Sequence, residues 1–127
     1  MIAKTREVLT GLGVTTVQDV TQPVESMSGG QRQALAIGRA VTWGSRIIIF
    51  DEPTAALGIP ETEQVLRLIE DFKGKGASIL LVTHNLGHVF RVADQILVMY
   101  QGRSVAQMSR QDTNLEKLAG VIVRGTH

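Results

Sequence analysis

The sequence predicts an α/β fold in which strands and helices alternate. Two short apolar runs rich in β-branched residues, Arg46–Phe50 and Ser78–Val82, have the length of strands. The first is apolar without interruption, as expected of a strand buried on both faces. Between the two runs, apolar residues recur at the spacing of an amphipathic helix: Val65, Leu68, Ile69 and Phe72. A strand, a helix and a second strand in this order predict a right-handed parallel crossover.

Two helices joined by an irregular connector are expected before the first strand. The first helix covers residues 7–12 and is ended by Gly11 and Gly13. The connector is Val14–Glu25, which contains Pro23. Residues 26–31 then lead into a helix over Gln33–Val41. One face of that helix is small and apolar: Ala34, Ile37, Gly38 and Val41.

The helix between the two strands has clear ends. Pro60 suits its first turn, and Glu61 and Glu63 favour its positive N-terminal end. Gly74 and Gly76 stop it.

The last third of the chain predicts a short helix, a hairpin and a final helix. The short helix has Leu86, Val89, Phe90 and Ala93 on one face. A strand over Gln95–Tyr100, a turn at Gln101-Gly102 and a return strand over Arg103–Met108 make the hairpin. Asn114 is placed to cap the final helix. The apolar face expected for that helix is Leu115, Leu118, Ala119 and Ile122.

Composition excludes several classes of protein. The chain has 127 residues, with 13 Lys and Arg against 12 Asp and Glu, so its net charge is +1. This balance argues against a basic footprint, and no nucleic-acid partner is expected. The longest apolar run, Ile47–Phe50, is far shorter than a membrane span. Cysteine is absent, which excludes disulfides and thiolate chemistry.

The segment Ser28-Gly29-Gly30-Gln31 opens a helix and has two readings. Two glycines allow the backbone to approach a ligand, and the free N–H groups of a helix start favour an anion. The alternative is a Gly-Gly turn in which Ser28 serves as an ordinary N-cap. These four residues alone do not decide between the two.

Asp51 and Glu52 follow the first strand directly. The carboxyl ends of parallel strands form the edge at which α/β proteins bind ligands. Asp51 is a candidate ligand of Mg²⁺, and Glu52 is a candidate to orient or deprotonate a water that attacks a phosphoryl group. The alternative is an acidic loop with Asp51 as a helix cap, which Pro53 disfavours.

His84 comes directly after the second strand, so neighbouring strands would bring it to the same edge as Asp51 and Glu52. A histidine after a strand is otherwise a structural hydrogen-bonding residue. His88 would share a helical face with His84 only if the helix began that early. No H-E-x-x-H pattern supports a metal site at this pair, and His88 is interpreted as a packing or surface residue.

Taken together, these motifs resemble the ATP-binding subunits of ABC transporters. Met27-Ser28-Gly29-Gly30-Gln31 looks like the signature loop of that family, and Ile47–Phe50 with Asp51-Glu52-Pro53-Thr54 looks like Walker B with its catalytic glutamate. Ala55-Ala56-Leu57-Gly58 falls at the D-loop, and Val82-Thr83-His84 looks like the switch-histidine segment. The run from Thr83 to Asp94 further resembles bacterial importers of simple sugars, of the ribose or fructose type.

The resemblance implies a role for each residue. Ser28, Gly29, Gly30 and Gln31 would contact the γ-phosphate of ATP held by the opposite subunit of a head-to-tail dimer. Asp51 would serve Mg²⁺, Glu52 would polarise the attacking water and His84 would contact the γ-phosphate. Transmembrane permease subunits would be the further partners, and the location would be the cytoplasmic face of the bacterial inner membrane.

Two departures from the family pattern stand out. The D-loop usually ends in Asp, where this chain has Gly58, and no G-x-x-x-x-G-K-[ST] sequence is present. The expected fold is thus a partial P-loop NTPase fold, lacking the Walker A strand and the N-terminal β-subdomain. Residues 1–45 would be the end of the helical subdomain, and residues 46–127 the C-terminal part of the RecA-like core. Without a Walker A strand, the strands at 79–82 and 95–100 would share no neighbour. Their apolar faces and ladder groups would then be exposed or would collapse together.

Three functions are compatible with this resemblance. The first is the C-terminal part of a sugar-importer ATPase. The second is a non-catalytic interaction module that offers its signature face to an intact subunit. The third, a DNA-repair or translation-type ABC protein, would call for coiled-coil insertions or a second cassette, which this sequence does not contain.

Overall fold

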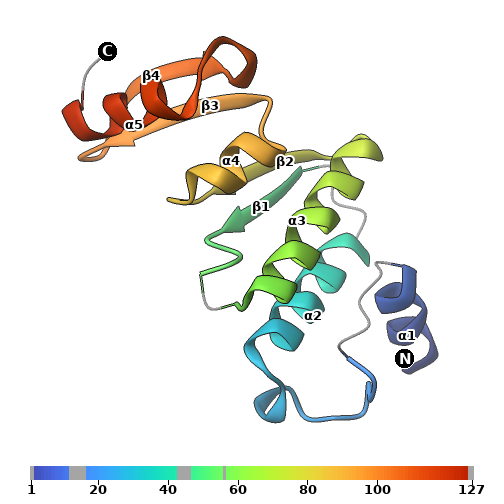
Figure 1. The fold of residues 1–127 in the computed structure, drawn as a ribbon. Coiled ribbons are helices and arrows are strands. Elements are labelled where there is room, and N and C mark those ends of the chain that lie inside the picture. Colours follow the sequence, from blue (N-terminus) through green and yellow to red (C-terminus); the bar gives the residue numbers. More distant parts are fainter. Residues whose placement is uncertain (1, 12–16, 43–46, 56, 126–127) are drawn as a thin grey trace. The chain divides into compact units, whose positions relative to one another are not determined.

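The computed structural model describes residues 2–11, 17–42, 47–55 and 57–125, which form two compact units, Met1–Val82 and Thr83–His127 (Figure 1). The first unit contains α1 (Ile2–Gly11), the 3-10 turn Val24–Ser26, α2 (Gly29–Thr42), β1 (Ile47–Asp51), α3 (Ile59–Gly74) and β2 (Ser78–Val82). Helices and strands alternate, which confirms the α/β class. The expected division of the chain at residue 45 stays a prediction.

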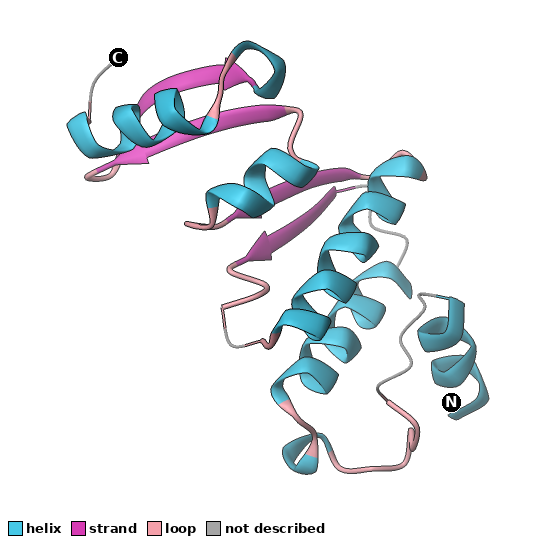
Figure 2. Cartoon of the chain, viewed as in Figure 1, coloured by secondary structure: helices cyan, strands magenta, loops and turns pink. Residues whose placement is uncertain are grey.

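β1 and β2 form a two-stranded parallel sheet, drawn in magenta in Figure 2. Ile47 pairs with Ser78 at one end and Asp51 with Val82 at the other. The predicted strand, helix and strand order is therefore confirmed, with α3 as the connection between the parallel strands. The register also brings the carboxyl ends of β1 and β2 together.

The side chains predicted to form the apolar face of α3 are all buried, and Leu66 joins them. Pro60 lies in the first turn, as expected. Gly74 is the last helical residue, and Gly76 follows with a φ of 85°, a left-handed conformation that favours glycine. The helix therefore begins and ends where the sequence indicates.

Burial of β1 on both faces is not observed. Ile48 and Phe50 are buried, whereas Ile47 and Ile49 each keep 66% of their surface exposed. On β2, Leu80 is also exposed. The reason is that no described element of this unit covers the second face of the sheet. The expected exposure of apolar faces is confirmed for the strand at 79–82, where Leu80 and Val82 are exposed, and for the strand at 95–100, where Leu97 and Met99 are exposed.

The two N-terminal helices begin earlier than predicted. α1 starts at Ile2 rather than Glu7 and ends at Gly11; Leu12 and Gly13 lie outside the described residues. α2 starts at Gly29 rather than Gln33, because hydrogen bonds between Ser28 and Gln31 stabilise the first helical turn, which includes the two glycines. Ala34, Ile37 and Gly38 are buried as predicted, while the side chain of Val41 is outside the description.

The second unit is a hairpin packed on helices. It contains α4 (Leu86–Val92), β3 (Gln95–Tyr100), β4 (Arg103–Ser109), the 3-10 turn Arg110–Asp112 and α5 (Leu115–Arg124). β3 and β4 pair antiparallel, with an irregularity between Val98 and Met99. Gln101 and Gly102 have φ angles of 48° and 77°, the left-handed pair that a tight two-residue hairpin turn requires.

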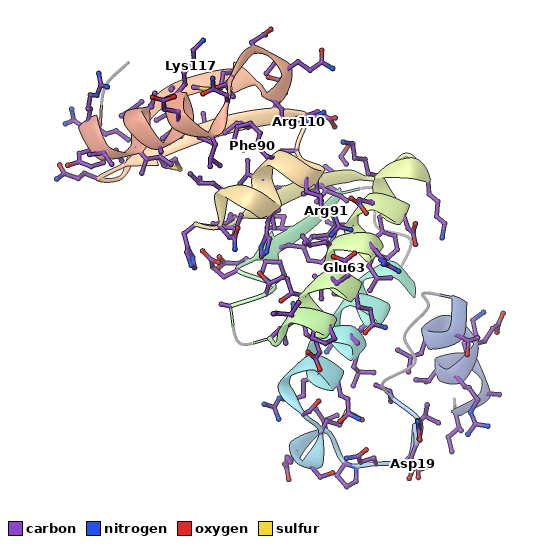
Figure 3. All side chains as sticks on the ribbon, in the orientation of Figure 1. Asp19, Glu63, Phe90, Arg91, Arg110 and Lys117 are labelled. Atoms are coloured by element: carbon purple, nitrogen blue, oxygen red, sulfur yellow. The ribbon has the colours of Figure 1, made fainter. Side chains whose placement is uncertain are left out.

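The core of this second unit is small and consists of Ile96, Val98, Ala106 and Leu118. Side chains of α4, among them Val89 and Phe90, pack against it as predicted. Arg110 holds the end of α4, since its Nη1 donates to the carbonyl oxygen of Phe90 at 3.4 Å (Figure 3).

The last helix differs from expectation in its buried face. Asn114 caps α5 as predicted, accepting a hydrogen bond from the N–H of Lys117 at 2.9 Å. Leu118 and Val121 face the hairpin, but Leu115 and Ile122 are exposed. The predicted apolar face was therefore wrong in part, because the apolar residues of α5 surround more of the helix than the narrow hairpin covers.

Candidate functional site

The Ser28–Gln31 loop is built as a capping box at the start of α2. The Oγ of Ser28 accepts a hydrogen bond from the N–H of Gln31 at 3.2 Å, and the Oε1 of Gln31 accepts one from the N–H of Ser28 at 2.8 Å. This reciprocal pair satisfies two backbone donors and fixes the loop. Ser28 is thus an N-cap, and Gly29 and Gly30 occupy the first turn, where a helix leaves N–H groups without internal partners.

The loop is anchored at its N-terminal side by Met27 and Arg32. The Met27 side chain is buried, and its carbonyl oxygen accepts a hydrogen bond from the Nη1 of Arg32 at 2.6 Å. Arg32 also donates its backbone N–H to the carbonyl oxygen of Ser28 at 3.0 Å. Sequence reasoning did not assign this role to Arg32, and only its position directly after Gln31 could have suggested it.

The second group of predicted site residues lies at the carboxyl end of β1. Asp51 is the last strand residue, is exposed and pairs with Val82. Glu52 follows, and its N–H donates to the carbonyl oxygen of Val82 at 2.9 Å, which extends the parallel ladder by one step. The structure therefore brings both carboxylates to the strand edge that the sequence indicated, and Asp51 caps no helix.

Glu52 has an unusual backbone conformation. Its φ is 43°, in the left-handed region that costs a residue with a Cβ about 1 kcal/mol. The turn that holds it is fixed by the hydrogen bond to Val82 and by its own carbonyl oxygen, which accepts from the N–H of Ala55 at 3.2 Å. The next residues, Pro53 and Thr54, are buried. A strained residue that is held in place by its surroundings is typical of functional sites.

The carboxylate of Asp51 fits a hard cation such as Mg²⁺. Its exposed oxygens are the ligand type that Mg²⁺ prefers, and Mg²⁺ is commonly held by one or two carboxylates together with phosphate oxygens and water. Among the described residues no group of three or more acidic, histidine or cysteine side chains is arranged to hold a metal by itself. The donor set at this edge therefore suits a metal that arrives with a phosphate ligand.

His84 and His88 do not share a helical face. α4 begins at Leu86, and Asn85 caps it by accepting a hydrogen bond from the N–H of His88 at 3.2 Å. His84 thus precedes the helix, and it is exposed. It belongs to the second compact unit, so its place beside Asp51 and Glu52 stays a prediction.

Gly58, the residue at the end of the D-loop segment, is the N-cap residue of α3 and provides no side-chain cap. The side chain of Glu61, in the first turn of α3, comes close to Gly58 and also to Gly30 of the signature loop. Sequence reasoning gave Glu61 only a favourable place at the helix N-terminus. Its approach to two glycines 28 positions apart in the sequence is a tertiary contact without a local signal.

Comparison with known proteins finds related sequences. Residues 2–55 match the ABC transporter domain family. The fructose import ATP-binding protein FrcA of Rhizobium meliloti is 46% identical over 112 residues, which cover 88% of this chain and 43% of that protein. The xylose/arabinose import ATP-binding protein XylG of Sulfolobus acidocaldarius is 38% identical over 122 residues, covering 96% of this chain and 48% of that protein. The chain thus spans less than half the length of these relatives.

Solved structures give the same fold. A nucleotide-free ATP-binding cassette of an ABC transporter superposes with a TM-score of 0.76 at 25% identity, over 95% of this chain and 46% of the other. An ABC transporter cassette in its ADP conformation gives a TM-score of 0.72 at 26% identity, over 95% and 45%. The fold is therefore a partial ABC ATPase fold. By sequence and by structure, the chain belongs to the family of ABC transporter ATP-binding proteins.

Proposed function

We propose that this chain provides part of the ATP-hydrolysing machinery of an ABC importer that takes up a small solute, a monosaccharide. The observation that carries the proposal is the pair Asp51 and Glu52 at the carboxyl edge of a parallel strand pair, with Glu52 held at a φ of 43°. An acidic loop without a function does not need a glutamate in a backbone conformation that glutamate rarely adopts. The sugar specificity rests on the relatives, which are named as import proteins for fructose and for xylose or arabinose.

In this proposal Glu52 is the residue that polarises the attacking water. Its backbone is fixed on both sides, by the hydrogen bonds to Val82 and from Ala55, so the Cα–Cβ bond of Glu52 leaves the strand end in a defined direction. A pre-positioned carboxylate within reach of a water raises the rate of hydrolysis because no reorganisation is needed in the transition state. His84 would contact the γ-phosphate.

Asp51 would hold Mg²⁺, which, when bound, neutralises charge on the phosphate oxygens. The signature loop has a separate task. The N–H groups of Gly29 and Gly30 and the positive end of α2 favour an anion, and the capping box of Ser28 and Gln31 keeps this end ordered. This loop would contact the γ-phosphate of ATP bound to a second subunit, in a head-to-tail dimer.

The assembly in this proposal includes a second ATP-binding subunit and transmembrane permease subunits, at the cytoplasmic face of the bacterial inner membrane. The described helices are all too short or too polar to cross a bilayer. Energy for solute passage would thus reach the membrane through contacts with the permease.

The test uses a chimera. The matching segment of the fructose import relative is replaced by this chain, so that a complete subunit carries these residues. We expect ATP hydrolysis by the chimera, and we expect Glu52→Gln to lower kcat at least about a hundredfold while ATP binding remains. Glu63→Gln is the matched control, because Glu63 lies on α3 in an exposed ion pair with Arg67 at 3.0 Å (Figure 3). Normal turnover by Glu52→Gln would contradict the role of Glu52.

The interaction module is the second candidate, favoured by the complete capping box at the start of α2. Here the chain is mixed with the fructose import relative whose own signature loop has been disabled. Restored hydrolysis that Ser28→Arg abolishes would show a signature contact made in trans. Restoration that is indifferent to Ser28→Arg would exclude that contact.

A further inference from the structure

One side chain, Glu61, fills the space left by two glycines that are far apart in the sequence. A Cβ atom placed on Gly30 would lie 2.7 Å from the Cγ of Glu61 and 3.4 Å from its Cβ. A Cβ atom placed on Gly58 would lie 2.7 Å from the Oε2 of Glu61 and 3.8 Å from its Cδ. Real Cβ atoms essentially never lie at 2.7 Å from a neighbour, so something must shift in each case. At Gly58 the neighbour is the mobile carboxylate end of Glu61, whereas at Gly30 it is the stem, so the need for glycine is stronger at Gly30.

The two contacts involve different parts of Glu61. Its apolar stem faces Gly30 in the signature loop, and its carboxylate faces Gly58 at the start of α3. The carboxylate lies in the first turn of α3, where the positive end of a helix favours a negative charge. The negative charge is therefore directed away from the glycine of the loop, and the loop is contacted by methylene groups.

We propose that Glu61 is a positioning residue, which fixes the signature loop against the N-terminal end of α3 through its stem. The loop has little else to hold its glycines, because a glycine has no side chain of its own to pack. The capping box fixes Ser28 and Gln31, and the hydrogen bond from Arg32 fixes the carbonyl group of Met27. Glu61 supplies the contact at Gly30, which lies between Ser28 and Gln31.

This inference rests on the proposed function for its consequence, since a displaced signature loop matters for hydrolysis only if the loop contacts nucleotide. In this inference the loop is held by the shape of the Glu61 stem and not by the charge of its carboxylate. Because the Cγ methylene makes the nearest contact with Gly30, Glu61→Gln preserves that contact, whereas Glu61→Ala removes it and leaves only the more distant Cβ.

The first test measures amide hydrogen exchange of the 127-residue chain. The N–H groups of Gln31 and Arg32 are bonded to Ser28 and report on the loop directly. We expect Glu61→Ala to raise their exchange rates about tenfold, whereas Glu61→Gln leaves them within about twofold of the unchanged chain. Glu63→Ala is the matched control, since it removes an exposed glutamate from the same helix.

A compensating pair sharpens this test. Gly30→Ala places a methyl group against the stem of Glu61 and should raise exchange at Gln31 and Arg32 at least about tenfold. Adding Glu61→Ala removes the colliding Cγ, and exchange should return to the level of Glu61→Ala alone. Additive effects of the two substitutions, or equal effects of Glu61→Ala and Glu63→Ala, would overturn the inference. If the chain without substitutions shows no protection at the amides of Gln31 and Arg32, the inference is overturned as well.

The second test uses the chimera with the fructose import relative. Glu61→Ala should lower kcat about tenfold and change the KM for ATP less than about twofold, because the loop acts on nucleotide that another segment binds. Glu61→Gln and Glu63→Ala should leave both constants unchanged. If the unsubstituted chimera does not hydrolyse ATP, the proposed function fails, and the exchange measurements still decide on Glu61. A chimera that hydrolyses ATP equally well with Glu61→Ala overturns the positioning role.

Discussion

The two units of the chain join their paired strands in different ways. In the second unit, β3 and β4 are joined by a two-residue turn, and Ile96, Val98, Ala106 and Leu118 make a core with both helices of that unit. In the first unit, β1 and β2 are joined through the 16-residue helix α3 and leave Ile47, Ile49, Leu80 and Val82 exposed. Antiparallel strands can pair with their sequence neighbour through a short turn, whereas parallel strands need a crossover and are normally covered by helices on both faces.

This difference separates a hairpin whose strands pair locally from a parallel pair joined across a helix. Both sheets keep an exposed apolar face, since Leu97 and Met99 of β3 are also exposed. The proposed catalytic carboxylates belong to the parallel pair, at the end of β1. Substitutions in each unit should therefore affect mainly the strands of that unit.

The largest effects are expected from the most buried side chain of each unit. Ile69 in α3 and Leu118 in α5 are each 1% exposed. Replacing either with Ala should lower the local free energy of unfolding by about 3 kcal/mol, because a cavity adds to the lost burial. Residue-resolved hydrogen exchange should show the Leu118→Ala change mainly in β3 and β4 and the Ile69→Ala change mainly in β1 and β2. The reverse pattern would break the comparison.

Two glycines should respond with opposite signs. Gly102, in the hairpin turn, has a φ of 77°, so Gly102→Ala should cost about 1 kcal/mol of backbone strain. Gly74 ends α3 at a negative φ, and nothing lies within 4 Å of an added Cβ, so Gly74→Ala should stabilise by about 0.5 kcal/mol. Thermal unfolding measures both. A destabilising Gly74→Ala would show that the end of α3 is less regular than described.

The exposed face of the β1–β2 sheet should accept charged side chains without loss of stability. Ile49 and Leu80 are cross-strand partners and are both exposed. Ile49→Lys with Leu80→Glu places opposite charges across the strands, so we expect a stability change within about 0.5 kcal/mol and lower fluorescence of a hydrophobic dye. Leu97→Lys, on the exposed side of β3, is the matched change in the second unit. Dye binding that stays unchanged in the first pair would show that this face is covered.

The smallest effect concerns Asp19, in the connector before the signature loop. Hydrogen bonds from the side chain and the N–H of Thr21, at 2.6 and 2.8 Å, lower the pKa of Asp19 below its usual 3.8. A lowered pKa stabilises the fold above the unfolded value, and this contribution is lost as the pH falls through the folded value. Thr21→Val should therefore raise the pKa of Asp19 in an NMR titration and slightly weaken the connector at neutral pH. An unchanged titration would contradict the hydrogen bonds as its cause.

Local patterns predicted the elements well. The four apolar residues of α3, its proline and its terminal glycines were sufficient to place it, and Gln101-Gly102 placed the hairpin turn. Which faces of the strands and helices are buried could not be predicted in the same way. A continuous apolar run such as Ile47–Phe50 is the same whether a strand has neighbours on both faces or on one, so burial of both faces was wrongly inferred. The face of α5 was misjudged for a similar reason, because most of its residues are apolar.

For the candidate site, the sequence predicted which side chains follow the strand but not their backbone geometry. The end of an apolar strand indicated Asp51 and Glu52, and S-x-x-Q contained the signal for the capping box, of which only the Ser28 half was considered. The positive φ of Glu52 has no sequence signal, since glutamate rarely adopts it. The contact of Glu61 with Gly30 and Gly58 arises from tertiary packing and could not be found from local spacing.

The left-handed backbone at Glu52 has an evolutionary consequence. Gly and Asn adopt this conformation at lower energy than Glu, so either one would make the turn after β1 more stable. Selection for folding alone would therefore favour loss of the carboxylate, and, under the role proposed for Glu52, selection for hydrolysis would oppose that loss. In a gene duplicate released from that proposed role, this position should drift towards Gly or Asn early, and the residue found there would show which of the two pressures had prevailed.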